Sequence, residues 1–267
     1  MTEKIKSSPV TSSIFLAFVL TIFWAGATFF VQGLSEQLGT LVLLLISSTI
    51  NIIFTILAVV LLGLINQVNS FRYVFKTKGL AKGLLVLIPV MAFFLFGLVF
   101  NASQAASADI EITWIFPANA FMQATSAFMQ NILFRGLLIT ALLIKFSSTE
   151  SERVRSVFKA SALYLIIYIP LNIVGGSGVE LMQLINTFVV GAGFCAAYLY
   201  SKNLLSLALA QGVWQILGSV IASFAAENYY NQPSPFALIP LIIILISIVI
   251  FTVRFSKRAE PFLVTTE

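Results

Sequence analysis

The chain has 267 residues, of which 59% are hydrophobic and only 9% are charged. A soluble domain carries about 25% charged residues because its surface has to be hydrated, so the composition excludes an ordinary soluble protein. The formal net charge is +5, histidine is absent, and Cys195 is the only cysteine. These counts exclude a disulfide framework and a cysteine-based metal cluster, and they remove the usual general base near neutral pH.

Eight apolar runs suggest membrane-spanning helices, which need about 20 residues to cross the hydrocarbon core, and the fifth of them is short. The first four are predicted at 14–31, 41–65, 84–100 and 121–144. The other four are predicted at 160–174, 181–200, 204–224 and 236–255. We therefore expect an all-α polytopic membrane protein of about eight transmembrane helices, with a single membrane domain over 1–267.

Basic residues gather in alternate connections between these runs. In an eight-span arrangement, 14 of the 15 Lys and Arg residues fall on one side, and the exception is Arg135 inside the fourth run. The opposite connections hold acidic residues such as Glu36 and Glu180 and no base. Cytoplasmic loops carry this excess of Lys and Arg, so we expect both chain ends in the cytoplasm. The basic loops are interpreted as topology determinants beside membrane lipid, and not as a nucleic-acid site.

Polar residues at helical spacing occur inside three of the runs, where burial in lipid is costly. Side chains four apart share one helix face. The residues are Gln123, Gln130, Asn131 and Arg135 in the fourth run, Tyr164, Tyr168 and Asn172 in the fifth, and Gln211, Gln215 and Ser219 in the seventh. We predict that the three faces meet and line a polar pocket. The alternative is hydrogen bonding that only holds the helices together.

Three short segments resemble the motifs of one family of membrane enzymes. Residues 129–138, Met-Gln-Asn-Ile-Leu-Phe-Arg-Gly-Leu-Leu, resemble the Glu-Glu-x-x-x-Arg motif of the CAAX protease and bacteriocin-processing family, also called the Abi family. Residues 164–170 resemble its Phe-x-x-x-His motif, and residues 211–215 its His-x-x-x-Asn motif. The resemblance covers about 120–220. It implies the bundle of the CAAX-type intramembrane endopeptidases and a place in a bacterial plasma membrane.

The motif positions differ from those of active members of the family, in which paired glutamates and two histidines hold a metal or activate water. The glutamate positions are Gln130 and Asn131, the histidine positions are Tyr168 and Gln211, and the asparagine position is Gln215. Only Arg135 keeps the family residue. Neutral amides are poor zinc ligands and cannot act as general bases. The comparison therefore implies a pseudoprotease with no intact catalytic residue, no zinc and no other cofactor.

The function expected from this resemblance is non-catalytic binding of a peptide or a membrane-protein partner, as in bacteriocin immunity or regulation. Two alternatives stay open: an active endopeptidase of the family with an atypical site, and a component of a small membrane transporter. For Arg135 we expect contacts with Asn131 and with Gln211 or Gln215. Its alternative is snorkelling toward the cytoplasmic headgroups.

Overall fold

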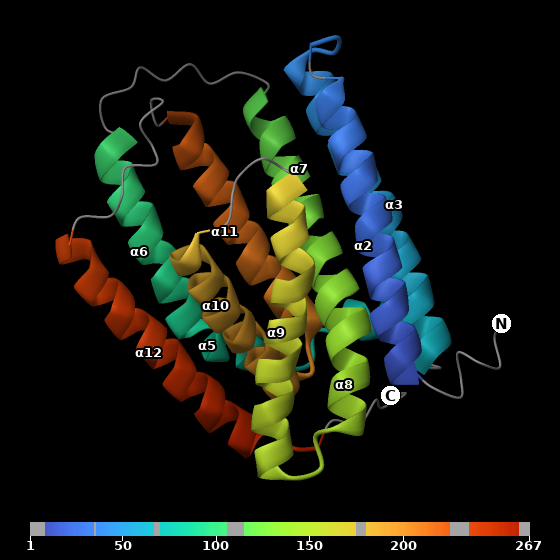
Figure 1. Cartoon of the computed structure of the whole chain (residues 1–267), viewed down its shortest axis with the longest axis vertical. Coiled ribbons are helices and arrows are strands. Elements are labelled where there is room, and N and C mark those ends of the chain that lie inside the picture. The colour runs from blue at the N-terminus through green and yellow to red at the C-terminus, as the bar shows by residue number, and fades with distance from the viewer. Residues whose placement is uncertain are drawn as a thin grey trace.

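The computed structural model describes residues 9–34, 36–66, 70–105, 115–174, 180–224 and 235–261. Within these ranges the regular structure is helical and contains no strand. Long helices lie alongside one another in a bundle (Figure 1). The first, α2 (Pro9–Gly33), begins at the same end of the bundle at which the last, α12 (Pro235–Arg258), finishes.

Each predicted apolar run coincides with helical structure. The long segments between α2 and α12 are α3 (Thr40–Asn66), α5 (Leu80–Val86) with α6 (Ile88–Ala105), α7 (Ile115–Gln130) with η1 (Asn131–Ile139) and α8 (Thr140–Lys145), α9 (Glu150–Val174), α10 (Leu181–Ser201) and α11 (Leu204–Phe224). A short helix, α4 (Ser70–Val74), precedes α5.

Five segments in the described ranges are long and apolar enough to cross a membrane: α2, α3, α7 to α8, α10 and α12. The bent pair α5 and α6 adds a sixth if it forms one span. The described apolar stretch of α11, 204–219, is shorter than a span, and the first ten residues of α9 include five charged ones. The all-α membrane fold is confirmed, whereas the count of eight spans stays a prediction.

The third predicted run is a bent pair of helices and not one straight span. The axes of α5 and α6 differ by 57°. Pro89 follows the break, and its ring nitrogen has no hydrogen to donate to the preceding turn. The N–H of Leu87, just before the break, still donates to the carbonyl oxygens of Gly83 and Leu84, at 3.2 and 3.1 Å, so α5 is regular up to that point. The bend therefore follows from the proline, as sharp helix kinks usually do.

Helix α9 begins at Glu150, ten residues before the predicted run. A capping box explains the early start. The Thr149 hydroxyl accepts the backbone N–H of Glu152, and the Glu152 carboxylate accepts the N–H of Thr149, both at 3.2 Å. The Ser148 hydroxyl also donates to this carboxylate, and these hydrogen bonds lower the pKa of Glu152. The first turns of α9 are thus stable outside the apolar region.

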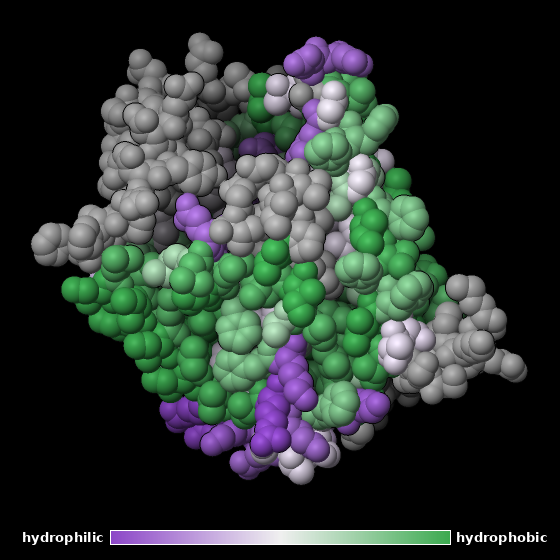
Figure 2. Space-filling view, in the orientation of Figure 1, coloured by the Kyte–Doolittle hydropathy of each residue, from purple (hydrophilic) through white to green (hydrophobic). Residues whose placement is uncertain are grey.

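The segment from α7 to α8 is at the centre of the bundle, and α12 is at its edge. In the most apolar window of each, 83% of residues are buried for α7 to α8 and 17% for α12. Helix α7 packs against α3 and α11, and α10 packs against α9 and α12. Figure 2 shows a hydrophobic belt around the visible side, with hydrophilic residues gathered at the end where α8 turns into α9. This distribution suits a bundle whose sides face lipid.

Arg153 fastens the end of α12 to the turn between α8 and α9. It is 7% exposed. Its Nε and Nη2 donate to the carbonyl oxygens of Ser256 and Lys257 at 3.2 and 3.1 Å. Its Nη1 donates to the carbonyl oxygens of Ser147 and Ser148 at 3.3 and 3.2 Å. Arg153 therefore donates to carbonyl groups that helix ends leave without partners. This role adds to the part in membrane topology that was expected from the sequence.

We expect Arg153→Ala to lower the free energy of unfolding by about 1–3 kcal/mol, because buried carbonyl oxygens lose their donors. Thermal unfolding of the purified protein in detergent measures the change. Arg155→Ala is the matched control, since Arg155 is exposed and exposed substitutions usually shift stability by less than about 0.5 kcal/mol. Equal thermal unfolding midpoints for the two variants would show that the contacts of Arg153 do not stabilise the protein.

The turn between α2 and α3 lies at the opposite end of the bundle from the turn between α8 and α9 (Figure 1). We expect cysteines introduced as Glu36→Cys and Arg155→Cys to react with a membrane-impermeant thiol reagent from opposite sides. The wild-type protein is the control, because its single cysteine, Cys195, is buried. If both variants were labelled from the same side, the two ends of the bundle would not face opposite sides of the membrane.

Candidate functional site

The centre of the bundle contains a π-helical segment, η1, in which every residue is buried. The backbone N–H of Thr140 donates to the carbonyl oxygen of Arg135, five residues earlier, and the Thr140 hydroxyl donates to the same oxygen at 3.3 Å. Neighbouring helices approach closely at Gly136, where a Cβ would lie 3.4 Å from Leu204 and 3.6 Å from Leu62. Segments of this kind occur frequently at functional sites.

Arg135 extends from η1 toward the preceding turn and meets two amide side chains. Its Nη1 donates to Oδ1 of Asn131 and, at 2.9 Å, to Oε1 of Gln211 on α11. The guanidinium carbon lies 4.3 Å from the centre of the Phe194 ring on α10, a cation–π contact. The side chain is 6% exposed. The expected contacts with Asn131 and with one of the two glutamines of α11 are therefore present. The side chain does not extend toward the α8 end, as snorkelling would require.

The amide groups of four residues continue the network from Arg135 into α7 and α11. Nδ2 of Asn131 donates to Oε1 of Gln211 at 3.0 Å and to the carbonyl oxygen of Ala127 at 2.7 Å. Nε2 of Gln211 donates to Oε1 of Gln130 at 2.6 Å, and Nε2 of Gln215 reaches the same oxygen at 3.5 Å. The polar faces of the fourth and seventh predicted runs thus bond directly to each other.

One acceptor of this group has no partner. Oε1 of Gln215 is buried and makes no hydrogen bond among the described residues, while its Nε2 holds Gln130. Gln130 in turn donates through Nε2 to the Ser126 hydroxyl at 3.1 Å. A buried polar atom without a partner calls for an explanation, such as a ligand or a water. The amide network therefore ends at Gln215 with an acceptor that has no donor among the described residues.

The third predicted face, on α9, is described only in part. Tyr164 packs its ring edge-on against Phe134, with ring centroids 5.1 Å apart. The side chains of Tyr168 and Asn172 lie outside the described residues. Of the other predicted polar residues, Ser219 donates to the carbonyl oxygen of Ile216 on its own helix, and the hydrogen bonds described for the network do not include Gln123.

A small cavity borders Arg135 on the side of α9 and α10. It is lined by Arg135, Phe134, Leu138, Ile139, Tyr164, Gly191 and Cys195. The cavity has room for about one water molecule. Tyr164 therefore adjoins the arginine across this space.

Sequence reasoning missed a second polar link beside the network. Trp24 on α2 donates through Nε1 to Oδ1 of Asn51 on α3 at 3.0 Å. Nδ2 of Asn51 donates to the Thr125 hydroxyl on α7 at 3.4 Å. Asn51 is 4% exposed. An asparagine in the middle of an apolar run was the available signal, because such a residue usually bonds across helices.

Comparison with known protein families places this network within a matching segment. Residues 112–217 match the family model described as type II CAAX prenyl endopeptidase Rce1-like. The segment is therefore related to the CAAX prenyl endopeptidases. It covers about two fifths of the chain. No match was found among the curated proteins or among the solved structures.

The CAAX-protease-like segment contains the three motifs recognised in the sequence, and the amide network joins residues of the first and the third. Gln130, Asn131 and Arg135 belong to the first motif, and Gln211 and Gln215 to the third. The resemblance predicted from these residues is confirmed. The resemblance could be recognised although the glutamate and histidine positions of the motifs hold other residues.

The residues at these positions do not fit a zinc ion. Zinc sites are built from thiolate, imidazole and carboxylate groups, whereas the groups here are amides and a guanidinium. The segments α7 to α8, α10 and α11 contain no Asp or Glu in their sequences, so no carboxylate of theirs offsets Arg135. Among the described residues, no three His, Cys, Asp or Glu side chains lie close enough to share a metal ion.

We expect Arg135→Ala to destabilise the protein by about 1–3 kcal/mol, because Oδ1 of Asn131 loses its donor and an unsatisfied buried group costs about that much, whereas Oε1 of Gln211 still accepts from Nδ2 of Asn131. Arg135→Lys should fare nearly as badly, since a compact, strongly hydrated ammonium cannot stack on Phe194. Thermal unfolding in detergent measures both, and Lys145→Ala, at the exposed end of α8, is the control. A fully stable Arg135→Leu variant would show that the network does not depend on the arginine.

Proposed function

We propose that this protein is a catalytically inactive member of the CAAX-type intramembrane endopeptidase family that binds a peptide or a membrane-protein partner within the bilayer. The observation that carries the proposal is the bonding of the motif residues to one another. A network of neutral amides surrounds the guanidinium of Arg135. The amides belong to Asn131, Gln211 and Gln130. Bacteriocin immunity and regulation of a membrane enzyme are roles that such binding would serve.

Peptide hydrolysis requires a group that takes a proton from water or a metal that activates it. A carboxamide does neither at physiological pH. The amide oxygens of Gln130 and Gln211 also accept hydrogen bonds from neighbouring side chains, so these oxygens are already committed to holding helices α7 and α11 together. This arrangement supports a protein that keeps the family fold and uses its polar centre for binding instead of hydrolysis.

A ligand would meet this centre at Gln215. Its buried Oε1 lacks a donor, and the backbone of an extended peptide presents N–H groups that need acceptors in a low-dielectric medium. The hydrogen bond between such an N–H and Gln215 would satisfy both groups. Binding of this kind needs no acid–base chemistry, which agrees with the residues present.

We expect the purified protein in lipid nanodiscs to bind a fluorescent farnesylated CAAX peptide or a leader-bearing bacteriocin peptide without cleaving it. Gln215→Leu should weaken binding about tenfold, the equivalent of about 1.4 kcal/mol, because one hydrogen bond is lost. Fluorescence anisotropy measures affinity, and mass spectrometry of the recovered peptide detects cleavage. Gln123→Leu is the matched control, since it is the same substitution outside the network.

Two results would overturn the proposal. Cleavage of either peptide, with about one tightly held zinc ion per protein that is lost in a Gln130→Ala and Gln211→Ala variant, would indicate an active endopeptidase with an atypical site. Absence of peptide binding together with tracer flux in proteoliposomes would indicate a transporter component.

A further inference from the structure

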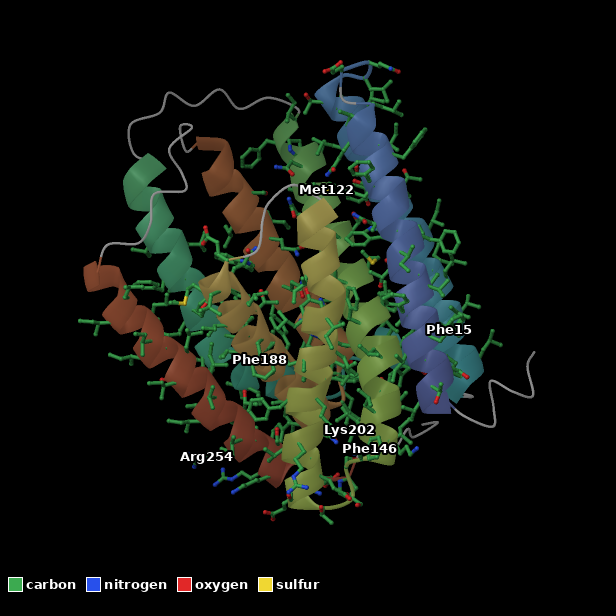
Figure 3. All side chains as sticks on the ribbon, viewed as in Figure 1. Phe15, Met122, Phe146, Phe188, Lys202 and Arg254 are labelled. Carbon is green, nitrogen blue, oxygen red and sulfur yellow. The ribbon has the colours of Figure 1, made fainter. Side chains whose placement is uncertain are left out.

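A second pocket lies at the end of the bundle where α10 and α12 finish, away from the amide network. Its volume is about 520 Å³. Five basic residues line it: Lys76, Lys78, Lys82, Lys202 and Arg258. Figure 3 shows Lys202 toward the same end of the bundle as Arg254 of α12. The one acidic residue of the lining, Glu260, has a side chain that is 87% exposed and lies 3.7 Å from Nζ of Lys202.

The backbone that carries these lysines is fixed by Asn203, which is fully buried. Its Nδ2 donates to the carbonyl oxygens of Lys76 and Lys78, at 2.7 and 3.0 Å. Its Oδ1 accepts the N–H of Ser206 in the first turn of α11, at 2.7 Å. Gly79 has a φ of +87°, and a Cβ there would collide with the carbonyl oxygen of Ser201. The segment from Lys76 to Gly79 is thus held in place before any ligand arrives.

Lys76 is half-buried, and its Nζ lies 4.8 Å from the centre of the Tyr73 ring. The hydroxyl groups of Tyr73 and Tyr198 share a hydrogen bond of 2.6 Å, which fixes that ring. Burial lowers the pKa of Lys76, and repulsion from Lys202 and Lys78 lowers it further. Positive groups are therefore held near one another by the fold, at a cost that a bound anion would remove.

We propose that this basic pocket binds a phosphate group, supplied by the headgroup of an anionic phospholipid or by a soluble phosphate compound. Basic pockets between membrane helices bind lipid headgroups in this way. The pocket opens at the ends of helices long enough to cross a membrane, so its depth is that of the headgroups. This position favours the lipid as the source.

The test compares the protein in phosphatidylcholine nanodiscs with three additions: a fluorescent short-chain phosphatidylglycerol, the matching phosphatidylcholine, and inorganic phosphate. The pocket variant combines Lys76→Gln, Lys78→Gln and Lys82→Gln. We expect wild type to bind phosphatidylglycerol, and the pocket variant to bind it about 100-fold more weakly, because three charged donors that line one pocket are lost together. The pocket variant should unfold in phosphatidylcholine at a temperature equal to or above that of wild type, because like charges have been removed.

The control variant combines Lys145→Gln, Arg155→Gln and Lys159→Gln, which removes the same charge from exposed positions on α8 and α9. It should bind phosphatidylglycerol as wild type does. Equal weakening of both triple variants would overturn the proposal in favour of general surface attraction, and so would equal binding of the two lipids by wild type. Competition by inorganic phosphate, lost in the pocket variant alone, would support the site and assign it to a soluble phosphate compound.

Discussion

The structure depends on how one charged side chain is accommodated in the middle of a membrane-type bundle. An unpaired arginine at the centre of a membrane helix costs about 2.5–3.5 kcal/mol even on insertion scales, so Arg135 must be surrounded by groups that replace water. Oδ1 of Asn131 and Oε1 of Gln211 do this from two elements, and the Phe194 ring covers the guanidinium from a third. Because the three elements are η1, α11 and α10, the arginine fixes the packing of the bundle centre.

Under the proposed function, the same amides explain how a family site would lose its chemistry without losing its fold. A carboxylate or imidazole at Gln130 or Gln211 would bond to its neighbours and also exchange protons. The amides provide the bonding without proton exchange, and they hold α7 and α11 together. Neutral groups also avoid the large desolvation penalty of buried charges. A binding role within the membrane is compatible with all of these contacts.

Much of the fold was predictable because long apolar runs and polar residues at four-residue spacing are local signals. Contacts of Arg135 with Asn131 and with Gln211 or Gln215 were expected from such spacing and from the family motifs, and the structure shows those with Asn131 and Gln211. The bend at Pro89 and the early start of α9 at Glu150 were missed, although Pro89 and the Thr149 capping box were visible in the sequence. The π-helical form of η1 and the contacts of Arg153 were not predictable. Both depend on which distant backbone groups come within reach, and a single sequence does not show this.

The contacts of Arg153 have a consequence for biogenesis. Two of its acceptors, the carbonyl oxygens of Ser256 and Lys257, belong to the last helix, and the other two belong to the turn that precedes α9. During synthesis the guanidinium leaves the ribosome about a hundred residues before these last acceptors. Its acceptors at Ser147 and Ser148 are close in sequence, so that half of the contact set lies within a segment made before α12. The other half joins residues 103 and 104 positions apart and is complete only once α12 has been synthesised.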